Sequence, residues 1–147
     1  MGNPLLGLSE NGMIFVQTYH SDPHEIWYSI PEYARNILRE KKARVFALDT
    51  VQIAKEVATD LSLQQRMQGI VLLGIFLKAT PFRKRFKLTK AELLVGIEKS
   101  IRKYFGSKGE AVIEDNMKAV RRGYDEAFEI PQEVMQSEPL ITEIQAN

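Results

Sequence analysis

The sequence predicts an α/β fold with a partial parallel sheet and a helix-rich C-terminal half. Two short runs of apolar, β-branched and aromatic residues, 12–18 and 44–48, are typical of strands. The first run has no polar alternation, so we expect it to be buried on both faces. Helical periodicity follows each run, and a strand–helix–strand–helix order favours parallel pairing through right-handed crossovers. Only helical patterns follow the second strand.

The residues between the two strands predict two short helices or one kinked helix. Pro23 disfavours the helical region for the residue before it, so either Ser21 or Asp22 could cap a helix that begins near Pro23. Apolar residues then recur at helical spacing as far as Lys41. Pro31 interrupts this pattern and marks a break or a restart.

The next two helical patterns follow the second strand directly. Thr50 is well placed to cap a helix that runs to about Ala58. The pattern at 63–79 is apolar nearly all round its C-terminal part, so we expect it to be buried on most sides, within the domain or under a partner. Gly69 and Gly74 in this helix permit a close approach of another backbone.

Two further helices are predicted beyond residue 88. Thr89 and Glu92 have the spacing of a capping box, which starts a helix that runs to about Tyr104. Gly106 is expected to stop that helix in the left-handed region. The last helix covers 109–128, and the polar residues from Gln132 onward are typical of a tail that becomes ordered on a partner.

Composition excludes several classes of function. The 147 residues suit one domain, and 20 basic against 19 acidic side chains leave a net charge of +1, so no nucleic acid or membrane surface is expected as an obligatory partner. The chain has no cysteine, which excludes disulfides, thiolate zinc sites and ordinary iron–sulfur ligation. No apolar run approaches the roughly 20 residues of a membrane span, and no signal peptide is recognisable, so a cytoplasmic protein is expected.

Two histidines are candidates for a metal site or a catalytic site, and both roles are disfavoured. His20 and His24 are four residues apart, but Pro23 lies between them and makes a continuous helix through both improbable. We therefore expect loop histidines and no metal site. An enzyme that uses His20 with Asp22 is a third hypothesis for function, disfavoured because no orienting group accompanies the pair.

Asp49 and Thr50 are weak candidates for cofactor binding. They follow the second strand, and ligands of open α/β sheets gather at the carboxyl ends of strands, where an acid can hold a ribose hydroxyl. No Gly-x-Gly-x-x-Gly pattern precedes them. A structural role for Asp49, in capping the next helix or bonding to the loop, is favoured over a ligand role.

A basic segment at 82–90 is the other candidate site, again a weak one. Arg83, Lys84 and Arg85 are followed by Lys87 and Lys90, with Phe82 directly before the first charge and Phe86 among the charges. We predict a loop there. It could bind the phosphates of coenzyme A or of RNA, or meet an acidic protein surface. The simplest alternative is a solvated loop with both phenylalanines in the core.

Several short motifs occur in a fixed order along residues 45–124. They are a strand followed by Asp-Thr-x-x-Ile-Ala-x-Glu at Val45–Glu56, a Leu73-Gly74 pair in an apolar helix, the turn Tyr-Phe-Gly-x-Lys-Gly-Glu at 104–110, and Asn116–Tyr124. This order resembles the C-terminal half of the gamma subunit, or fused gamma domain, of the 2-oxoacid:ferredoxin oxidoreductases, the pyruvate:ferredoxin oxidoreductase family. The resemblance implies a Rossmann-like domain at 1–130 and a C-terminal tail at 131–147.

The resemblance also implies a function. Enzymes of this family decarboxylate a 2-oxoacid oxidatively with coenzyme A, using thiamine diphosphate in alpha and beta parts and iron–sulfur clusters in a delta part, with ferredoxin as electron acceptor. The implied role of this chain is accessory, either structural or as a gate over the coenzyme A entrance, with no catalytic residue of its own. Two departures are evident, since no Gly-Phe-Gly-Gly-Gln-Gly-type turn is present and Gly69 stands where an asparagine is usual.

Overall fold

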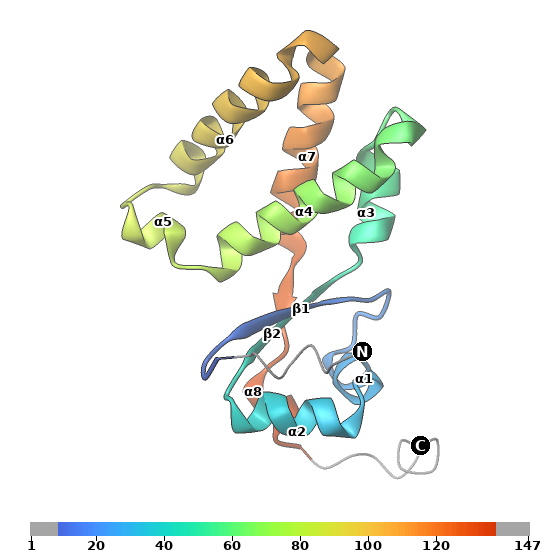
Figure 1. The fold of residues 1–147 in the computed structure, drawn as a ribbon, viewed down its shortest axis with the longest axis vertical. Helices are drawn as coiled ribbons and strands as arrows, with labels where there is room; N and C mark the ends of the chain where they lie inside the picture. Colours follow the sequence, from blue (N-terminus) through green and yellow to red (C-terminus); the bar gives the residue numbers. More distant parts are fainter. Residues whose placement is uncertain (1–8, 138–147) are drawn as a thin grey trace. The chain divides into compact units, whose positions relative to one another are not determined.

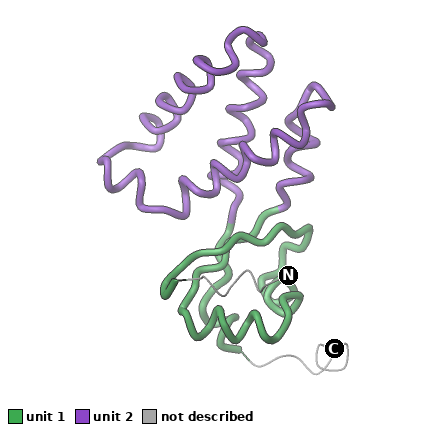
Figure 2. Tube along the Cα trace, viewed as in Figure 1, with its two compact units in different colours: residues 1–48, 128–147 green, residues 49–127 purple. Residues whose placement is uncertain are grey.

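A computed structural model describes residues 9–137 of the chain. The chain forms two compact units (Figure 2). Unit 1 comprises Met1–Leu48 and Phe128–Asn147, and unit 2 comprises Asp49–Ala127. Unit 1 contains the sheet, and the regular elements of unit 2 are all helices. The α/β class with a helix-rich C-terminal half is therefore confirmed.

A three-stranded mixed sheet forms the centre of unit 1 (Figure 1). The strands β1 (Met13–Gln17) and β2 (Arg44–Leu48) pair in parallel, as predicted from the element order. The short strand β3 (Phe128–Glu129) pairs antiparallel with β2 on its other side. β3 was not predicted, because two residues are too few to show a period.

The prediction that the first strand is buried on both faces is wrong. β1 is an edge strand, since among the described strands only β2 pairs with it. Met13 and Gln17 are exposed, and the three residues between them are half-buried. The central strand β2 shows the burial that was expected of β1, with its last four residues buried. An apolar run alone does not distinguish a central strand from an edge strand.

Two short helices lie between β1 and β2, and the predicted break is confirmed. α1 is Pro23–Ser29, and the Asp22 side chain caps it by accepting a hydrogen bond from the backbone N–H of His24 at 3.0 Å. α2 is Glu32–Glu40, with Pro31 as its N-cap residue. These helices supply four residues to the core of unit 1. The buried residues of that core are Ile26, Trp27, Tyr28, Leu38, Ala43, Val45, Ala47, Ile130, Val134 and Met135.

The segment after β3 is part of this core, and the tail expected from Gln132 onward does not begin there. Gln132–Met135 forms the short helix α8, in which Met135 is fully buried. The Tyr28 hydroxyl donates a hydrogen bond to the carbonyl oxygen of Ser137 at 2.5 Å, which fixes the end of this segment. Residues 138–147 of the expected tail lie outside the described residues.

Unit 2 contains three long helices and two short ones. The helices that correspond to the predicted patterns are α3 (Thr50–Val57), α4 (Gln64–Ala79), α6 (Lys90–Phe105) and α7 (Glu110–Glu126), and 3-10 turns lie at Leu61–Leu63 and Gly106–Lys108. The segment predicted as a basic loop is helical over Phe82–Arg85, which is α5. The loop prediction is therefore wrong for these four residues, since Pro81 precedes them and can start a helical turn.

Gly106 does not adopt the left-handed conformation that was predicted. Its φ is −58°, because a 3-10 turn continues from the end of α6. The reversal falls three residues later at Gly109, whose φ of +100° is accessible to glycine at little cost. The corner between α6 and α7 therefore depends on Gly109.

The capping box at the start of α6 is confirmed. The Thr89 hydroxyl accepts from the backbone N–H of Glu92 at 3.1 Å, and the Glu92 carboxylate accepts from the backbone N–H of Thr89 at 3.1 Å. These hydrogen bonds favour the charged form and lower the pKa of Glu92.

We expect Thr89→Ala to destabilise unit 2 by about 1 kcal/mol, because it leaves one backbone N–H at the start of α6 without its acceptor. Thr89→Asn keeps a capping oxygen and should stay close to the original stability. Urea unfolding followed by far-UV circular dichroism measures both. Equal stabilities of the two variants would show that the cap contributes nothing.

The helices α4 and α7 approach each other through glycine. A Cβ atom built on Gly74 would lie 2.2 Å from the carbonyl oxygen of Val120, and one built on Gly123 would lie 2.1 Å from the carbonyl oxygen of Val71. The close backbone approach predicted for Gly74 is confirmed. Gly69 has nothing within 4 Å of such an atom, so it takes no part in this crossing.

Polar contacts hold α3 to α7. The buried carboxylate of Asp115 accepts from the backbone N–H of Thr59 at 3.0 Å and from its hydroxyl at 2.7 Å. Arg122 contacts Glu56 at 3.2 Å and Glu126 at 2.6 Å. α7 is therefore the central helix of unit 2, in contact with α3, α4 and α6.

Within residues 9–137, the helices are either too short or too polar to span a lipid bilayer.

Candidate functional site

Asp49 and Thr50 have structural roles at the start of α3. The Asp49 carboxylate accepts from the backbone N–H of Gln52 at 3.0 Å, so Asp49 is the N-cap residue. Thr50, which was predicted to be the cap, is already the first helical residue and is buried. The capping role favoured for Asp49 is confirmed, the cap at Thr50 is wrong, and a ligand role for either residue stays a prediction.

The basic candidates Arg83, Lys84 and Arg85 lie together on α5. The rings of Phe82 and Phe86 lie four residues apart on this turn, with centroids 4.8 Å apart. Phe82 is 37% exposed and Phe86 is 58% exposed, so the expectation that both lie in the core is wrong. α5 is therefore a short basic helix beside two partly exposed aromatic rings.

The His20 side chain makes local contacts. His20 Nδ1 lies 2.9 Å from a carboxylate oxygen of Glu25, and the His20 ring stacks on Tyr19 at a centroid distance of 4.2 Å. Asp22 caps α1, so the structure does not join it to His20. Among the described residues, no group of three or more histidine, aspartate or glutamate side chains could hold a metal ion.

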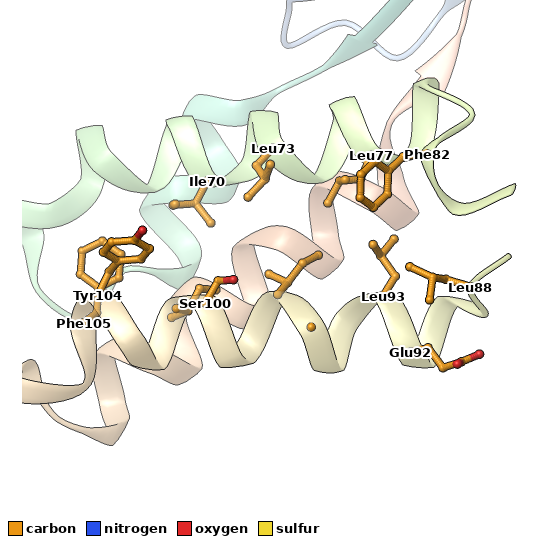
Figure 3. A pocket seen from close by; sticks show the side chains of 13 residues that line it. Ile70, Leu73, Leu77, Phe82, Leu88, Glu92, Leu93, Ser100, Tyr104 and Phe105 are labelled. Atoms are coloured by element: carbon orange, nitrogen blue, oxygen red, sulfur yellow. The ribbon is translucent and has the colours of Figure 1, made fainter. Parts of the chain in front are cut away.

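An apolar groove with a volume of about 490 Å³ lies between α4 and α6 in unit 2 (Figure 3). We call it the α4–α6 groove. The lining side chains are Ile70, Leu73, Leu77, Phe82, Leu88, Glu92, Leu93, Ile97, Ser100, Ile101, Tyr104 and Phe105, and Gly96 contributes backbone. Apart from Glu92, Ser100 and the Tyr104 hydroxyl, this surface is apolar.

The packing of unit 2 explains why the groove is open. α4 and α6 both contact α7, where Ile101, Ile113, Met117 and Val120 form a small core. Gly74 and Gly123 bring α4 close to α7, and this contact buries only one side of α4.

The other side of α4 is partly exposed in the part of the chain that the structure describes. Leu72 and Leu73 are each 39% exposed, and Phe76 is 53% exposed. The helix was predicted to be buried on most sides, within the domain or under a partner. The alternative in which the domain itself buries the helix on most sides is wrong. A cluster of exposed leucine and phenylalanine side chains beside an apolar groove is typical of a surface that another molecule covers.

Cations lie near both ends of the α4–α6 groove. Arg66 lies 5.3 Å from the Phe105 ring and Lys103 lies 5.9 Å from the Tyr104 ring, at one end of the lining. At the other end α5 carries three cations beside Phe82. These cations are Arg66, Arg83, Lys84, Arg85 and Lys103, and none of them forms an ion pair with another residue of the described part of the chain.

Sequence reasoning missed this groove. Leu93, Ile97 and Tyr104 recur at helical spacing on α6, which is typical of a helix face that packs on a core, yet Tyr104 is 72% exposed. One signal was present in the sequence. Gly96 lies in the middle of α6, where glycine costs about 1 kcal/mol relative to alanine, and no neighbour within 4 Å of a built Cβ atom requires it there.

The sequence matches the model of the protein family described as pyruvate ferredoxin/flavodoxin oxidoreductase over residues 2–126. The match therefore includes all but the last residue of unit 2 and most of the described part of unit 1. It also includes both sides of the α4–α6 groove.

Individual relatives agree with this assignment. The chain is 25% identical over 120 residues to a putative pyruvate-flavodoxin oxidoreductase of Synechocystis, which covers 82% of this chain and 9% of that protein. It is 24% identical over 127 residues to the pyruvate-flavodoxin oxidoreductase of Trichormus variabilis, a match that covers 86% of this chain and 10% of that protein. It is 25% identical over 124 residues to a probable pyruvate-flavodoxin oxidoreductase of Escherichia coli, a match that covers 84% of this chain and 10% of that protein. The chain thus spans about a tenth of the length of these relatives. It belongs to the pyruvate ferredoxin/flavodoxin oxidoreductase family.

Proposed function

We propose that this chain is a gamma-type accessory component of a 2-oxoacid:ferredoxin oxidoreductase. In this proposal the complete enzyme converts a 2-oxoacid and coenzyme A into an acyl-coenzyme A and carbon dioxide, and passes two electrons to ferredoxin or flavodoxin. The chain contributes contact surface, or acts as a gate over the coenzyme A entrance. Alpha-, beta- and delta-type parts of the enzyme are its partners.

The observation that carries the proposal is the open apolar surface of unit 2 in a chain that matches about a tenth of its relatives. The relatives bear the name of a complete oxidoreductase, and roughly nine tenths of each has no counterpart in this sequence. Exposed Leu72, Leu73 and Phe76 and the α4–α6 groove need cover in water, because exposed apolar patches of this kind are costly. The remainder of the enzyme is the natural cover.

The cofactors of the proposed enzyme differ in how well this chain suits them. Iron–sulfur clusters are held by cysteine thiolates, and the sequence contains none, so the residues here do not fit such a cluster. In the proposal the clusters and thiamine diphosphate reside on the other parts. Arg83, Lys84 and Arg85 are the residues of this chain that could contact the phosphates of coenzyme A.

Reconstitution tests the proposed function. The 147-residue chain is mixed with the thiamine- and cluster-bearing polypeptides of the same source, and coenzyme A-dependent reduction of ferredoxin by pyruvate and other 2-oxoacids is measured. We expect no turnover by the chain alone, stable co-purification, and a rate increase when the chain is added. Turnover by the isolated chain, or recovery of a lone monomer after mixing, would contradict the proposal.

RNA binding by the basic segment 82–90 is the competing function. It predicts affinity for a single-stranded oligonucleotide that falls with salt and disappears when Arg83, Lys84 and Arg85 are replaced together by alanine. An accessory role predicts that the same replacement affects assembly and that the oligonucleotide binds with no measurable affinity at physiological salt.

A further inference from the structure

We propose that the α4–α6 groove binds an acidic amphipathic helix of the polypeptide that completes the enzyme. The inference rests on the proposed function and specifies the partner of that surface. Apolar residues of the incoming helix would enter the groove, and its carboxylates would pair with the cations near the two ends of the groove.

The length and chemistry of the groove favour a helix as the occupant. Lining residues recur along α6 from Glu92 to Phe105, nearly the whole helix. Sixteen residues of α-helix extend about 24 Å, which matches about 16 residues of an antiparallel or parallel partner helix. In Figure 3 Leu73 and Leu77 on α4 point toward α6, and Leu77 lies opposite Leu93, so both walls of the groove present apolar side chains.

Gly96 supports the close approach of a second backbone. It is exposed in the middle of α6, lines the groove, and has no atom within 4 Å of a built Cβ atom. The glycines of the α4–α7 crossing show what such a residue does when the neighbouring helix is present, since both have a backbone carbonyl in the space a Cβ atom would fill. At Gly96 the equivalent space is empty among the described residues, so a second backbone could approach there.

The charged residues near the groove favour a negatively charged partner. Among the described lining residues Glu92 is the one charged side chain, and its carboxylate accepts a hydrogen bond from the backbone N–H of Thr89. The charge preference of the groove therefore depends on the cations near its two ends. These cations have no ion-pair partner among the described residues, whereas Lys90 and Arg102 on α6 are paired with Asp125 and with Glu98 and Glu110. An occupant with glutamate or aspartate beside its apolar stripe would satisfy them.

Two synthetic peptides of about 18 residues test the inference on the full-length chain. Both have leucine at helical a and d positions; one has glutamate at the other positions and one has lysine. Fluorescence anisotropy should show that the glutamate peptide binds at least about tenfold more tightly than the lysine peptide at low salt. Equal affinities, or no binding of the glutamate peptide, would overturn the inference.

Substitutions locate the binding. Gly96→Phe should abolish binding of the glutamate peptide, while Val95→Phe adds the same ring at the neighbouring position outside the lining and should leave it unchanged. Replacing Arg83, Lys84 and Arg85 together by glutamate should weaken binding at least about tenfold. The matched control, in which glutamate replaces Lys55, Lys118 and Arg121, makes the same change in net charge elsewhere on unit 2. Undiminished binding by Gly96→Phe would overturn the groove assignment.

Other occupants give other results. A dansyl-labelled undecanoic acid that binds where the glutamate peptide does not would identify an acyl-chain site and overturn the inference. Sedimentation that shows a dimer which Gly96→Phe dissociates, without peptide binding, would identify a second copy instead and would also overturn it. Peptide binding and reconstituted turnover are separate measurements, so the inference can fail while the accessory role stands, or the reverse.

Discussion

Replacing Gly74 or Gly123 by alanine is expected to destabilise unit 2 by about 3 kcal/mol, at the upper end of the usual cost of overpacking. An added Cβ atom at Gly74 would lie 2.2 Å from a carbonyl oxygen of the facing helix, and one at Gly123 would lie 2.1 Å from another. Both obstacles are backbone atoms inside helices, so no side chain can rotate away. α4 and α7 must separate, and the small core at Ile101, Met117 and Val120 loosens with them.

Alanine at two other glycines is expected to stabilise the protein instead of destabilising it. The comparison of the two pairs of variants therefore tests the crossing of α4 and α7 directly. Gly69→Ala and Gly96→Ala add a methyl group where nothing lies within 4 Å, in exposed helical positions. Each should stabilise the protein by about 0.5–1 kcal/mol through helix propensity. Urea unfolding followed by far-UV circular dichroism measures all four variants. Similar midpoints for the two pairs would contradict the glycine-mediated crossing.

Trp27→Ala is expected to cost unit 1 about 3–5 kcal/mol. The side chain is fully buried at the centre of the core that α1, α2, α8 and the sheet share, and the guanidinium of Arg39 lies 5.7 Å from its ring. This cost is comparable with the total stability of many small domains. Hydrogen exchange of the Ile130 amide, which donates to Val45 across the sheet at 2.8 Å, should accelerate accordingly.

Two further variants test whether the cost of Trp27→Ala comes from the volume lost in the core or from the loss of any aromatic ring in unit 1. The indole Nε1 of Trp27 is buried and has no hydrogen-bond partner among the described residues, so Trp27→Phe removes an unsatisfied donor and should cost much less than Trp27→Ala. Tyr33→Ala on α2 removes an aromatic ring that is 59% exposed and should change stability by at most about 0.5 kcal/mol. Equal losses in Trp27→Phe and Trp27→Ala would contradict this interpretation of the core.

Local chemistry predicted much of the fold. The caps at Asp22 and at Thr89 with Glu92, and the break at Pro31, each depend on a few neighbouring residues, and the structure contains all of them. The parallel pairing of β1 and β2 follows from their order and from chain chirality. Such features need no knowledge of which distant segments meet.

The features that were missed depend on distant contacts. β3 and α8 are only two and four residues long, and packing within unit 1 supports them more than any periodic pattern does. Phe82 and Phe86 were assigned to a core by hydrophobicity, although no part of the described chain covers them fully. Gly123 could be recognised only once α7 was known to cross α4, and the groove only once α6 was known to stand apart from α4.

The central claim is that the assembled enzyme covers the α4–α6 groove. Because the chain has no cysteine, Gly96→Cys introduces a single thiol at the groove, and Ala111→Cys introduces one at an exposed position of α7 as a control. The measurement is the rate of maleimide labelling of this chain, followed by its mass, before and after assembly with the other polypeptides. We predict that assembly slows labelling at position 96 at least about tenfold and leaves position 111 unchanged. An unchanged rate at position 96 in the assembled, active enzyme would contradict the account.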